Sequence, residues 1–141
     1  MTKLLSCSEI KKLDNKTIKN KKITSLDLMS GAVLAVEKWI INNYKKNHKF
    51  SIICGNGNNG ADGILLSSKL MLRNYKVQTY YINQVGSPEF NHQFNYAKKI
   101  GVNLEKIDFD NLRLIDFSDV IIDCIFGVGL NREITGKYLK L

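Results

Sequence analysis

The sequence lacks a long apolar run, and this absence limits the kind of protein that it can encode. No stretch of its 141 residues approaches the roughly 20 apolar residues that a membrane-spanning helix needs. The first residues, MTKLLSCSEIKK, also lack the apolar segment and the small-residue cleavage site of a secretory signal. We therefore expect a cytoplasmic protein without a membrane partner.

Cysteine is scarce as well. The three cysteines, Cys7, Cys54 and Cys124, are odd in number and lie far apart in the chain. Such spacing fits neither a disulfide framework nor a zinc site. Because Cys54 and Cys124 each lie within an apolar run, we expect them to be buried, unreactive thiols.

Acidic residues are outnumbered by basic ones, 13 to 21, and the net charge is +8. An excess of this size could suit a polyanionic partner. The lysines, however, are scattered along the chain, and their densest cluster, residues 11–22, has none of the interleaved aromatic residues of a single-strand binder. We interpret the cluster as the solvated face of a helix and expect no nucleic-acid partner.

The residues that are present predict one α/β domain. The length, with 44% hydrophobic and 24% charged residues, is typical of a single globular domain. Helical spacing of apolar residues predicts helices over 7–20, capped by Ser8, and over 25–44. The remaining patterns alternate, with strands predicted over 50–54, 76–82, 102–107 and 119–127 and helices over 62–74, 88–101 and 109–116. This alternation predicts a parallel, doubly wound sheet.

Two glycine-bearing loops, 55–63 and 127–136, each follow a predicted strand. Ligands of open α/β sheets bind at the carboxyl ends of the strands, so the loops could form two walls of one crevice. Glycine permits a positive φ and a close approach of a ligand to the backbone. Since the first loop leads into a helix, its N–H groups could also hold an anion.

The first loop lacks the parts that would complete a better-known nucleotide motif. Its glycines have the G-x-G-x-x-G spacing of dinucleotide folds, but no Lys-Ser/Thr pair follows, so it is not a Walker loop. No acidic residue lies near the end of the next predicted strand, at 80–83, where a dinucleotide fold would bind the ribose. An ordinary dinucleotide-dependent oxidoreductase is therefore disfavoured.

Polar side chains in the loops have competing interpretations. Asn58 and Asn59 could join Asp123 in an oxygen set for an alkali or alkaline-earth cation, or merely accommodate a left-handed backbone. The backbone role is the one that we prefer for Asn56. Asp62 is predicted to cap the following helix. Asp123 ends an apolar strand, where a carboxylate is costly to bury without a partner, and this favours a functional role.

The second loop contains Arg132 and Glu133. The arginine could hold a phosphate through two parallel hydrogen bonds. It could equally pair with Glu133 in an ordinary exposed loop.

Three segments together resemble the YjeF N-terminal domain family, the NAD(P)H-hydrate epimerases. ICGNGNNGADG resembles that family's G-x-GNNGGDG signature, and VIIDCIFGVGLNREITGKY resembles a second signature, D-A-L-F-G-T-G-L-x-R-x-x-x-G-x-Y. SLDLMSGA, at 25–32, is similar to the family's S-L-x-L-M-E-N-A-G helix. The three segments occur in the family's order, and the likeness covers nearly the whole chain.

The resemblance implies a Rossmann-like, three-layer α/β/α fold and a homodimer. It implies an isomerase that interconverts the R and S epimers, at C6 of the hydrated nicotinamide ring, of NADHX and NADPHX. A separate S-specific dehydratase would then restore NAD(P)H. The resemblance also implies a bound potassium ion (K+), with Asn59 and Asp123 among its ligands. The substrate contacts that it implies are Asn58, Asn59, Gly60, Ala61, Asp62, Gly127, Val128, Gly129, Leu130, Asn131, Arg132 and Glu133.

The chain departs from the family pattern in three respects. Ala61 replaces a glycine and would be strained if that position needed a positive φ. The helix over 25–44 loses the family's Glu-Asn pair. Family members also continue for about another third, which includes an aspartate, a potassium ligand and closing strands. We therefore expect residues 1–141 to form a single domain with an exposed sheet edge and uncovered apolar surface.

These departures leave two candidates for a catalytic acid or base, Asp62 and Asp123. The alternative function is a truncated, non-catalytic module of the same fold that binds a nucleotide or a protein.

Overall fold

The computed structural model describes residues 4–110, 118–130 and 133–140. No helix in these residues is both long and apolar enough to cross a membrane. The elements follow one another as α1 (Cys7–Lys21), α2 (Ser25–Asn43), β1 (Lys49–Cys54), α3 (Asn58–Leu72), β2 (Lys76–Tyr81), α4 (Pro88–Lys99), β3 (Leu104–Lys106), β4 (Val120–Cys124) and η2 (Gly136–Lys140).

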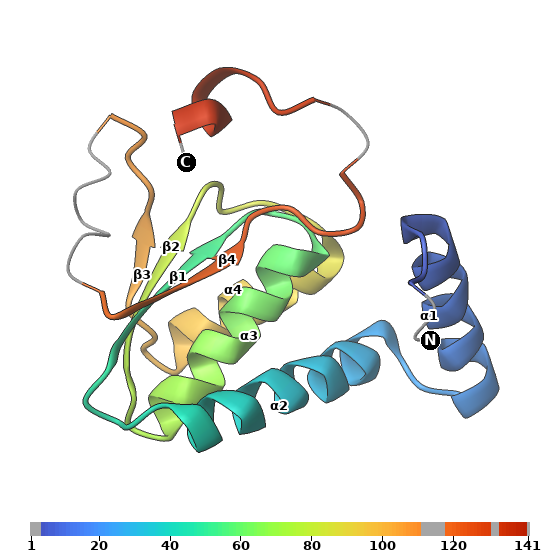
Figure 1. Cartoon of the computed structure of the whole chain (residues 1–141), viewed down its shortest axis with the longest axis horizontal. Helices are drawn as coiled ribbons and strands as arrows, with labels where there is room; N and C mark the ends of the chain where they lie inside the picture. The colour runs from blue at the N-terminus through green and yellow to red at the C-terminus, as the bar shows by residue number, and fades with distance from the viewer. Residues whose placement is uncertain (1–3, 111–117, 131–132, 141) are drawn as a thin grey trace.

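The strands form a parallel sheet in the order β3-β2-β1-β4. From β1 the chain passes through α3 to β2 and through α4 to β3, always toward the same edge (Figure 1). β4 lies on the other side of β1. The winding therefore reverses between β1 and β4, and this is where open α/β sheets bind their ligands.

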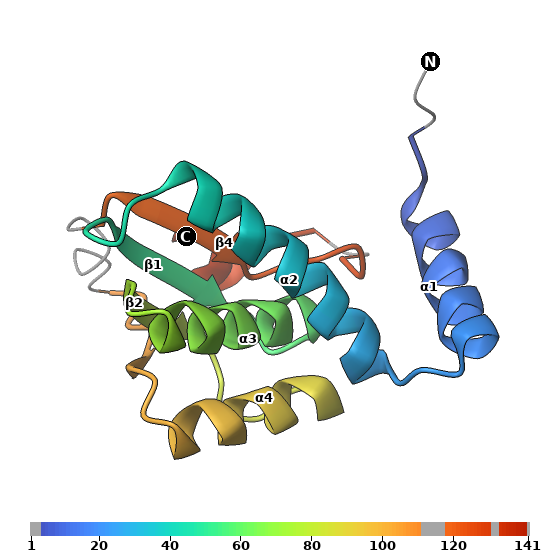
Figure 2. The same ribbon diagram turned by 90° about the horizontal axis from the view of Figure 1, so that it is seen from below.

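The two faces of the sheet are covered differently. α2, α3 and α4 pack together on one face, where Phe50, Ile52 and Ile64 belong to the main core (Figure 2). On the opposite face Ile53 and Tyr80 belong to a smaller cluster, which the C-terminal segment joins. In the described residues, the predicted parallel α/β architecture is thus confirmed, with three helices gathered on one face.

Several helix ends agree with the sequence predictions because local signals fix them. α4 begins as predicted: Ser87 accepts a hydrogen bond from the Phe90 N–H, and Pro88 occupies the first turn. Gly101, just beyond α4, has a φ of +81°. The prediction that Ser8 caps α1 is wrong, because Ser6 is the cap and exchanges hydrogen bonds with Glu9.

The start of α3 also differs from the prediction. The helix begins at Asn58 rather than near Asp62, so Asp62 lies within the helix and does not cap it. Low helix propensity of asparagine and glycine is overridden here by packing, since Gly60, Ala61 and Gly63 are all buried. Ala61 does not have a positive φ, so the backbone strain that a positive φ would have caused at this alanine is absent. The predicted helix over 109–116 falls largely outside the described residues.

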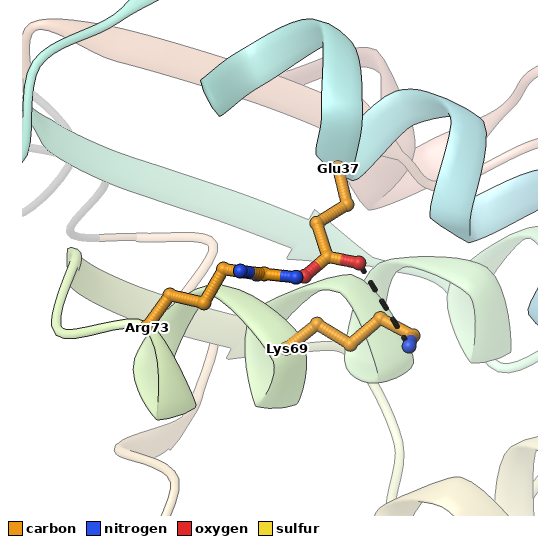
Figure 3. Close-up of polar contacts among 3 residues, drawn as sticks. All are labelled: Glu37, Lys69 and Arg73. Atoms are coloured by element: carbon orange, nitrogen blue, oxygen red, sulfur yellow. Dashed lines mark hydrogen bonds and ion pairs between the residues drawn. The ribbon is translucent and has the colours of Figure 1, made fainter. Parts of the chain in front are cut away.

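A buried carboxylate joins α2 to α3. The Glu37 side chain is only 3% exposed, and its Oε1 accepts a hydrogen bond from Arg73 Nε at 2.5 Å (Figure 3). Lys69 Nζ lies 3.8 Å from the Glu37 Oε2. Lys69 lies in the last turn of α3 and Arg73 is its C-cap residue, so this ion-pair cluster helps to fix the end of the helix opposite to the site.

Candidate functional site

A cavity of about 770 Å³ opens where β1 and β4 end. Its walls come from the two glycine loops, the first turn of α3, α1 and the C-terminal segment. The lining residues are Lys11, Asp14, Gly55, Asn56, Gly57, Asn58, Asn59, Asp62, Ile82, Ile125, Phe126, Gly127, Val128, Gly129, Leu130 and Tyr138. The prediction that the two loops form walls of one crevice is therefore confirmed.

The glycines bring the loop backbones together. A Cβ on Gly60 would lie 1.8 Å from the Gly55 carbonyl oxygen, and one on Gly55 would lie 2.1 Å from the Ile125 carbonyl oxygen. Neither glycine has a positive φ, so neither uses the left-handed conformation that glycine permits. Their physical requirement is space, because any side chain would push one backbone segment away from another.

One side-chain hydrogen bond joins the two walls. Asn59, in the first turn of α3, donates from Nδ2 to the Phe126 carbonyl at 3.0 Å. A Cβ on Gly127 would lie 3.0 Å from the Asn59 Cβ, so the next residue of the loop packs directly on this asparagine. Asn56 instead donates to the Val85 carbonyl at 3.3 Å and has no positive φ. The left-handed backbone predicted for Asn56 is therefore wrong, and its side chain instead bonds the neighbouring loop while the residue lines the cavity.

The N-terminus of α3 lies at the cavity. Its cap, Gly57, offers no side-chain hydrogen bond, and Asn58 and Asn59 in the first turn line the cavity. The first N–H groups of a helix have no partner within the helix and carry the positive end of its dipole. This wall is therefore suited to an anionic group.

Asp62 is the half-buried carboxyl group of the cavity. It lies one turn after Asn58, and burial raises the pKa of its carboxyl to about 6. No hydrogen bond or ion pair joins it to another part of the described chain. Its charge also adds to burial in raising the pKa of the Cys124 thiol to about 12, so this cysteine is a poor nucleophile. Asp62 can thus gain and lose a proton near neutral pH.

The surroundings of Asp123 differ from those predicted from the sequence. The expectation of a costly buried carboxylate is wrong, because β4 is an edge strand of the described sheet and Asp123 is exposed. Its Oδ1 accepts a hydrogen bond from the Ile125 N–H at 2.8 Å. Ile121, on the same strand, is 54% exposed, which agrees with the expected apolar surface at the edge. The case for a functional role of Asp123 therefore rests on its carboxylate oxygens and not on its burial.

The oxygen atoms of Asn59 and Asp123 suit a hard alkali or alkaline-earth cation better than a soft transition metal, although Asn59 lines the cavity and Asp123 does not. The side-chain nitrogen of Asn59 donates to the Phe126 carbonyl, so the orientation of the amide is fixed and Oδ1 is available as an acceptor. The Asp123 Oδ1 accepts the Ile125 N–H, and its Oδ2 is available as a second acceptor. The described residues contain no group of three or more His, Cys, Asp or Glu side chains placed to hold a metal ion. Amide, carboxylate and backbone oxygens are hard ligands of the kind that alkali and alkaline-earth cations bind.

The remaining predicted contacts divide into three groups. Residues 127–130 line the cavity, as do Asn58 and Asn59. Gly60 and Ala61 are buried and do not line it, and Glu133 is exposed elsewhere. Asn131 and Arg132 lie outside the described residues.

Six cavity residues were not singled out in the sequence: Lys11, Asp14, Ile82, Ile125, Phe126 and Tyr138. Tyr138 lies in the segment that resembles the family's second signature, and its ring is 5.4 Å from that of Phe126. Lys11 and Asp14 come from α1, whose charges were interpreted only as a solvated face. A tyrosine within a recognised signature could have been singled out. Nothing local in α1 indicates that it approaches the strand ends.

Comparison with known proteins decides the family. The sequence profile described as YjeF-related protein N-terminus matches residues 25–141. The chain belongs to this family. Within the YjeF-related family, the match includes both glycine loops but begins after α1.

Curated relatives extend the likeness. The NAD(P)H-hydrate epimerase of Anaerococcus prevotii is 33% identical over 134 residues, which cover 90% of this chain and 61% of that protein. The NAD(P)H-hydrate epimerase of Limosilactobacillus fermentum is 31% identical over 134 residues, covering 95% of this chain and 64% of the relative. The Helicobacter pylori bifunctional NAD(P)H-hydrate repair enzyme Nnr is 31% identical over 119 residues, or 84% of this chain and 25% of the relative. The chain thus spans less than two thirds of the length of each.

The fold has a counterpart among solved structures. The crystal structure of yeast ynu0 matches with a TM-score of 0.79 at 22% sequence identity. The match covers 95% of this chain and 60% of the yeast chain. It shows that the arrangement of helices and parallel strands described above is that of a known fold.

Proposed function

We propose that this protein is an NAD(P)H-hydrate epimerase, which interconverts the R and S epimers of NADHX and NADPHX. The observation that carries the proposal is the cavity at the winding reversal, which both family signatures line. Its volume, about 770 Å³, lies in the range of small-molecule sites. Two relatives that are about 30% identical carry the name of this enzyme.

In this proposal the two walls have different tasks. The N-terminus of α3 would attract a phosphate group of the nucleotide. The apolar side chains of Ile82, Ile125 and Leu130 would hold the ring system and exclude water. The hydrogen bond between Asn59 and Phe126 would keep the two walls at a fixed separation.

Asp62 would serve as the acid and base. The hydroxyl on C6 is attached to a carbon bonded to the ring nitrogen. Asp62 would take the hydroxyl proton while the bond between C6 and nitrogen breaks, and the electron pair of that bond would stay on the nitrogen. The nitrogen would then receive the proton, which leaves an open ring with an aldehyde at C6. Closure on the other face of that aldehyde would restore the bond and give the other epimer. A carboxyl group with a pKa of about 6 can take up this proton and return it at neutral pH.

The proposal also includes a bound potassium ion, which stays a prediction. Asn59 Oδ1 and Asp123 Oδ2 would be the ligands from the described residues. The ion would supply a positive charge beside the phosphate groups. The homodimer and the separate dehydratase that would take up the S epimer stay predictions.

The direct test is epimerisation by the full chain. Purified (R)-NADPHX is supplied with potassium and an S-specific dehydratase, and the formation of NADPH is followed by absorbance. We expect recovery above the spontaneous rate, with loss of activity in Asp62→Asn and reduced activity in Asp123→Ala. Asp119→Ala is the matched control, since Asp119 also accepts a backbone N–H bond but at the other end of β4.

The failure of this test would be informative. If the folded protein binds ADP-ribose but does not raise the rate, the alternative, a non-catalytic nucleotide-binding module, is favoured. If it neither binds nor turns over, the proposed function is wrong. Equal activity in sodium and in potassium would remove the ion from the proposal while leaving the epimerase intact.

A further inference from the structure

α1 contributes charged side chains to a cavity that is lined mainly by the two glycine-bearing signature segments. Lys11 and Asp14 lie one helical turn apart and both line it. The family profile begins at residue 25, four residues after α1 ends. Figures 1 and 2 show α1 standing apart from the layer of α2, α3 and α4. The contribution of α1 to the site is therefore distinct from the two signatures.

Apolar packing does little to explain the position of α1. None of its residues is buried, and Leu13 is 52% exposed. Ile10 and Ile18 are only half-buried. Little hydrophobic free energy is gained where α1 meets the rest of the protein. What the helix clearly adds at the cavity is charge.

The distribution of charge in the cavity is uneven. Three of its lining side chains can be charged, and Lys11 is the single cation among the described ones. Within the described chain, Lys11 takes part in no ion pair. The lysine ammonium is thus available to a ligand. The other electropositive feature of the cavity is the N-terminus of α3, so Lys11 and this helix end together face the negative charges of Asp14 and Asp62.

We propose that Lys11 binds a phosphate group of the nucleotide, which makes α1 part of the substrate-binding site. This inference rests on the proposed function, because the substrates of that reaction carry a pyrophosphate. Lysine acts as a compact point charge that pairs with phosphate oxygens. Asp14, on the adjacent turn, opposes the binding of an anion and limits the affinity.

The two residues therefore have opposite expected effects. Lys11→Ala should raise KM for (R)-NADPHX about three- to fivefold, as expected for one exposed charged contact, with kcat little changed. Asp14→Asn should lower KM. Lys11→Arg, which keeps the charge, should stay near the wild-type value. Lys12→Ala is the control, since Lys12 is a neighbouring lysine of α1 that does not line the cavity.

A second measurement does not depend on turnover. The Kd for ADP-ribose is measured by calorimetry for the same variants, and Lys11→Ala should weaken binding by the same factor. Ligand-dependent protection of α1 from trypsin, which cleaves after lysine, should be present in the wild-type protein and reduced in Lys11→Ala. The protection reports directly on whether the ligand holds the helix.

The outcomes separate this inference from the proposed function. If the wild type is active but Lys11→Ala and Lys12→Ala behave alike, the inference is wrong and the epimerase stands. If ADP-ribose binds without turnover, catalysis is excluded, while the Kd of Lys11→Ala still decides the role of the lysine. If the wild type neither binds ADP-ribose nor epimerises, both proposals fall together.

Discussion

Asn59 donates its side-chain amide to the carbonyl oxygen of Phe126, 3.0 Å away, and so joins the first turn of α3 to the loop after β4. The two residues are separated by 67 positions in the sequence. This bond connects the two signature segments and at the same time orients the amide oxygen of Asn59.

Removing this bond should affect activity more than stability. Asn59→Ala should cost about 1 kcal/mol of unfolding free energy, the usual value of one net hydrogen bond. Epimerase activity should fall at least tenfold, on the order of 1.4 kcal/mol, because the walls are no longer held at a fixed separation. Chemical denaturation and the coupled dehydratase assay measure the two effects. Asn43→Ala, which loses a side-chain amide bond to the Trp39 carbonyl at the end of α2, should keep its activity.

The stability of Asp62→Asn relative to the wild type should depend on pH. The folded protein binds the Asp62 proton more tightly than the unfolded chain does, because burial raises the pKa from 3.8 to about 6. Ionised Asp62 therefore destabilises the fold. The penalty is absent below pH 3.8, grows between pH 3.8 and 6 and is complete above pH 6.

Asp62→Asn should accordingly be more stable than the wild type at pH 7, by about 1 to 2 kcal/mol after allowance for solvent at the carboxyl group. The advantage should disappear near pH 4. Urea denaturation at both pH values measures it. A constant difference across this range would contradict a raised pKa.

Two glycine substitutions should have opposite effects. Gly60→Ala places a Cβ 1.8 Å from the Gly55 carbonyl oxygen, so the backbone must shift, at a cost of about 3 kcal/mol. Gly31→Ala is the matched control within α2, where a Cβ meets nothing within 4 Å. It should stabilise the protein by about 0.5 to 1 kcal/mol. Thermal unfolding of both variants checks the pair, and equal melting temperatures would contradict the packing described.

The ion-pair cluster of Glu37 predicts an asymmetry between its members (Figure 3). The carboxylate is 3% exposed, whereas the Arg73 side chain is 53% exposed. Arg73→Met should cost about 2 kcal/mol because the carboxylate stays buried with only Lys69 near it. Glu37→Met should cost less than 1 kcal/mol, since both cations can turn to water. Denaturation midpoints measure the two costs, and a larger loss in Glu37→Met would overturn this account.

The elements that the sequence predicted well are those that local chemistry determines. Strand β1 follows from its apolar run, and α4 follows from Ser87, Pro88 and Gly101. The beginning of α3 could not be predicted in this way. Its first three residues have poor helix propensity, and they are helical because Gly60 fits against the Gly55 carbonyl.

The loops of the candidate site could be predicted from the sequence, but the positions of its charged side chains could not. The signatures located the walls, because loops that follow parallel strands meet at one edge of the sheet. The exposure of Asp123 depends on the position of β4 in the sheet, which no residue of that strand specifies. The place of Lys11 at the cavity depends on where a whole helix lies, and its neighbours in the sequence give no sign of this.

The close contact of Gly60 with Gly55, and of Gly55 with Ile125, also restricts how this protein can change over time. A side chain gained at either glycine would have to be matched by the retreat of a backbone in another segment, in the second case one that is 70 positions away. The two signature segments therefore constrain one another's sequences. Successful substitutions in one are expected to occur together with substitutions in the other.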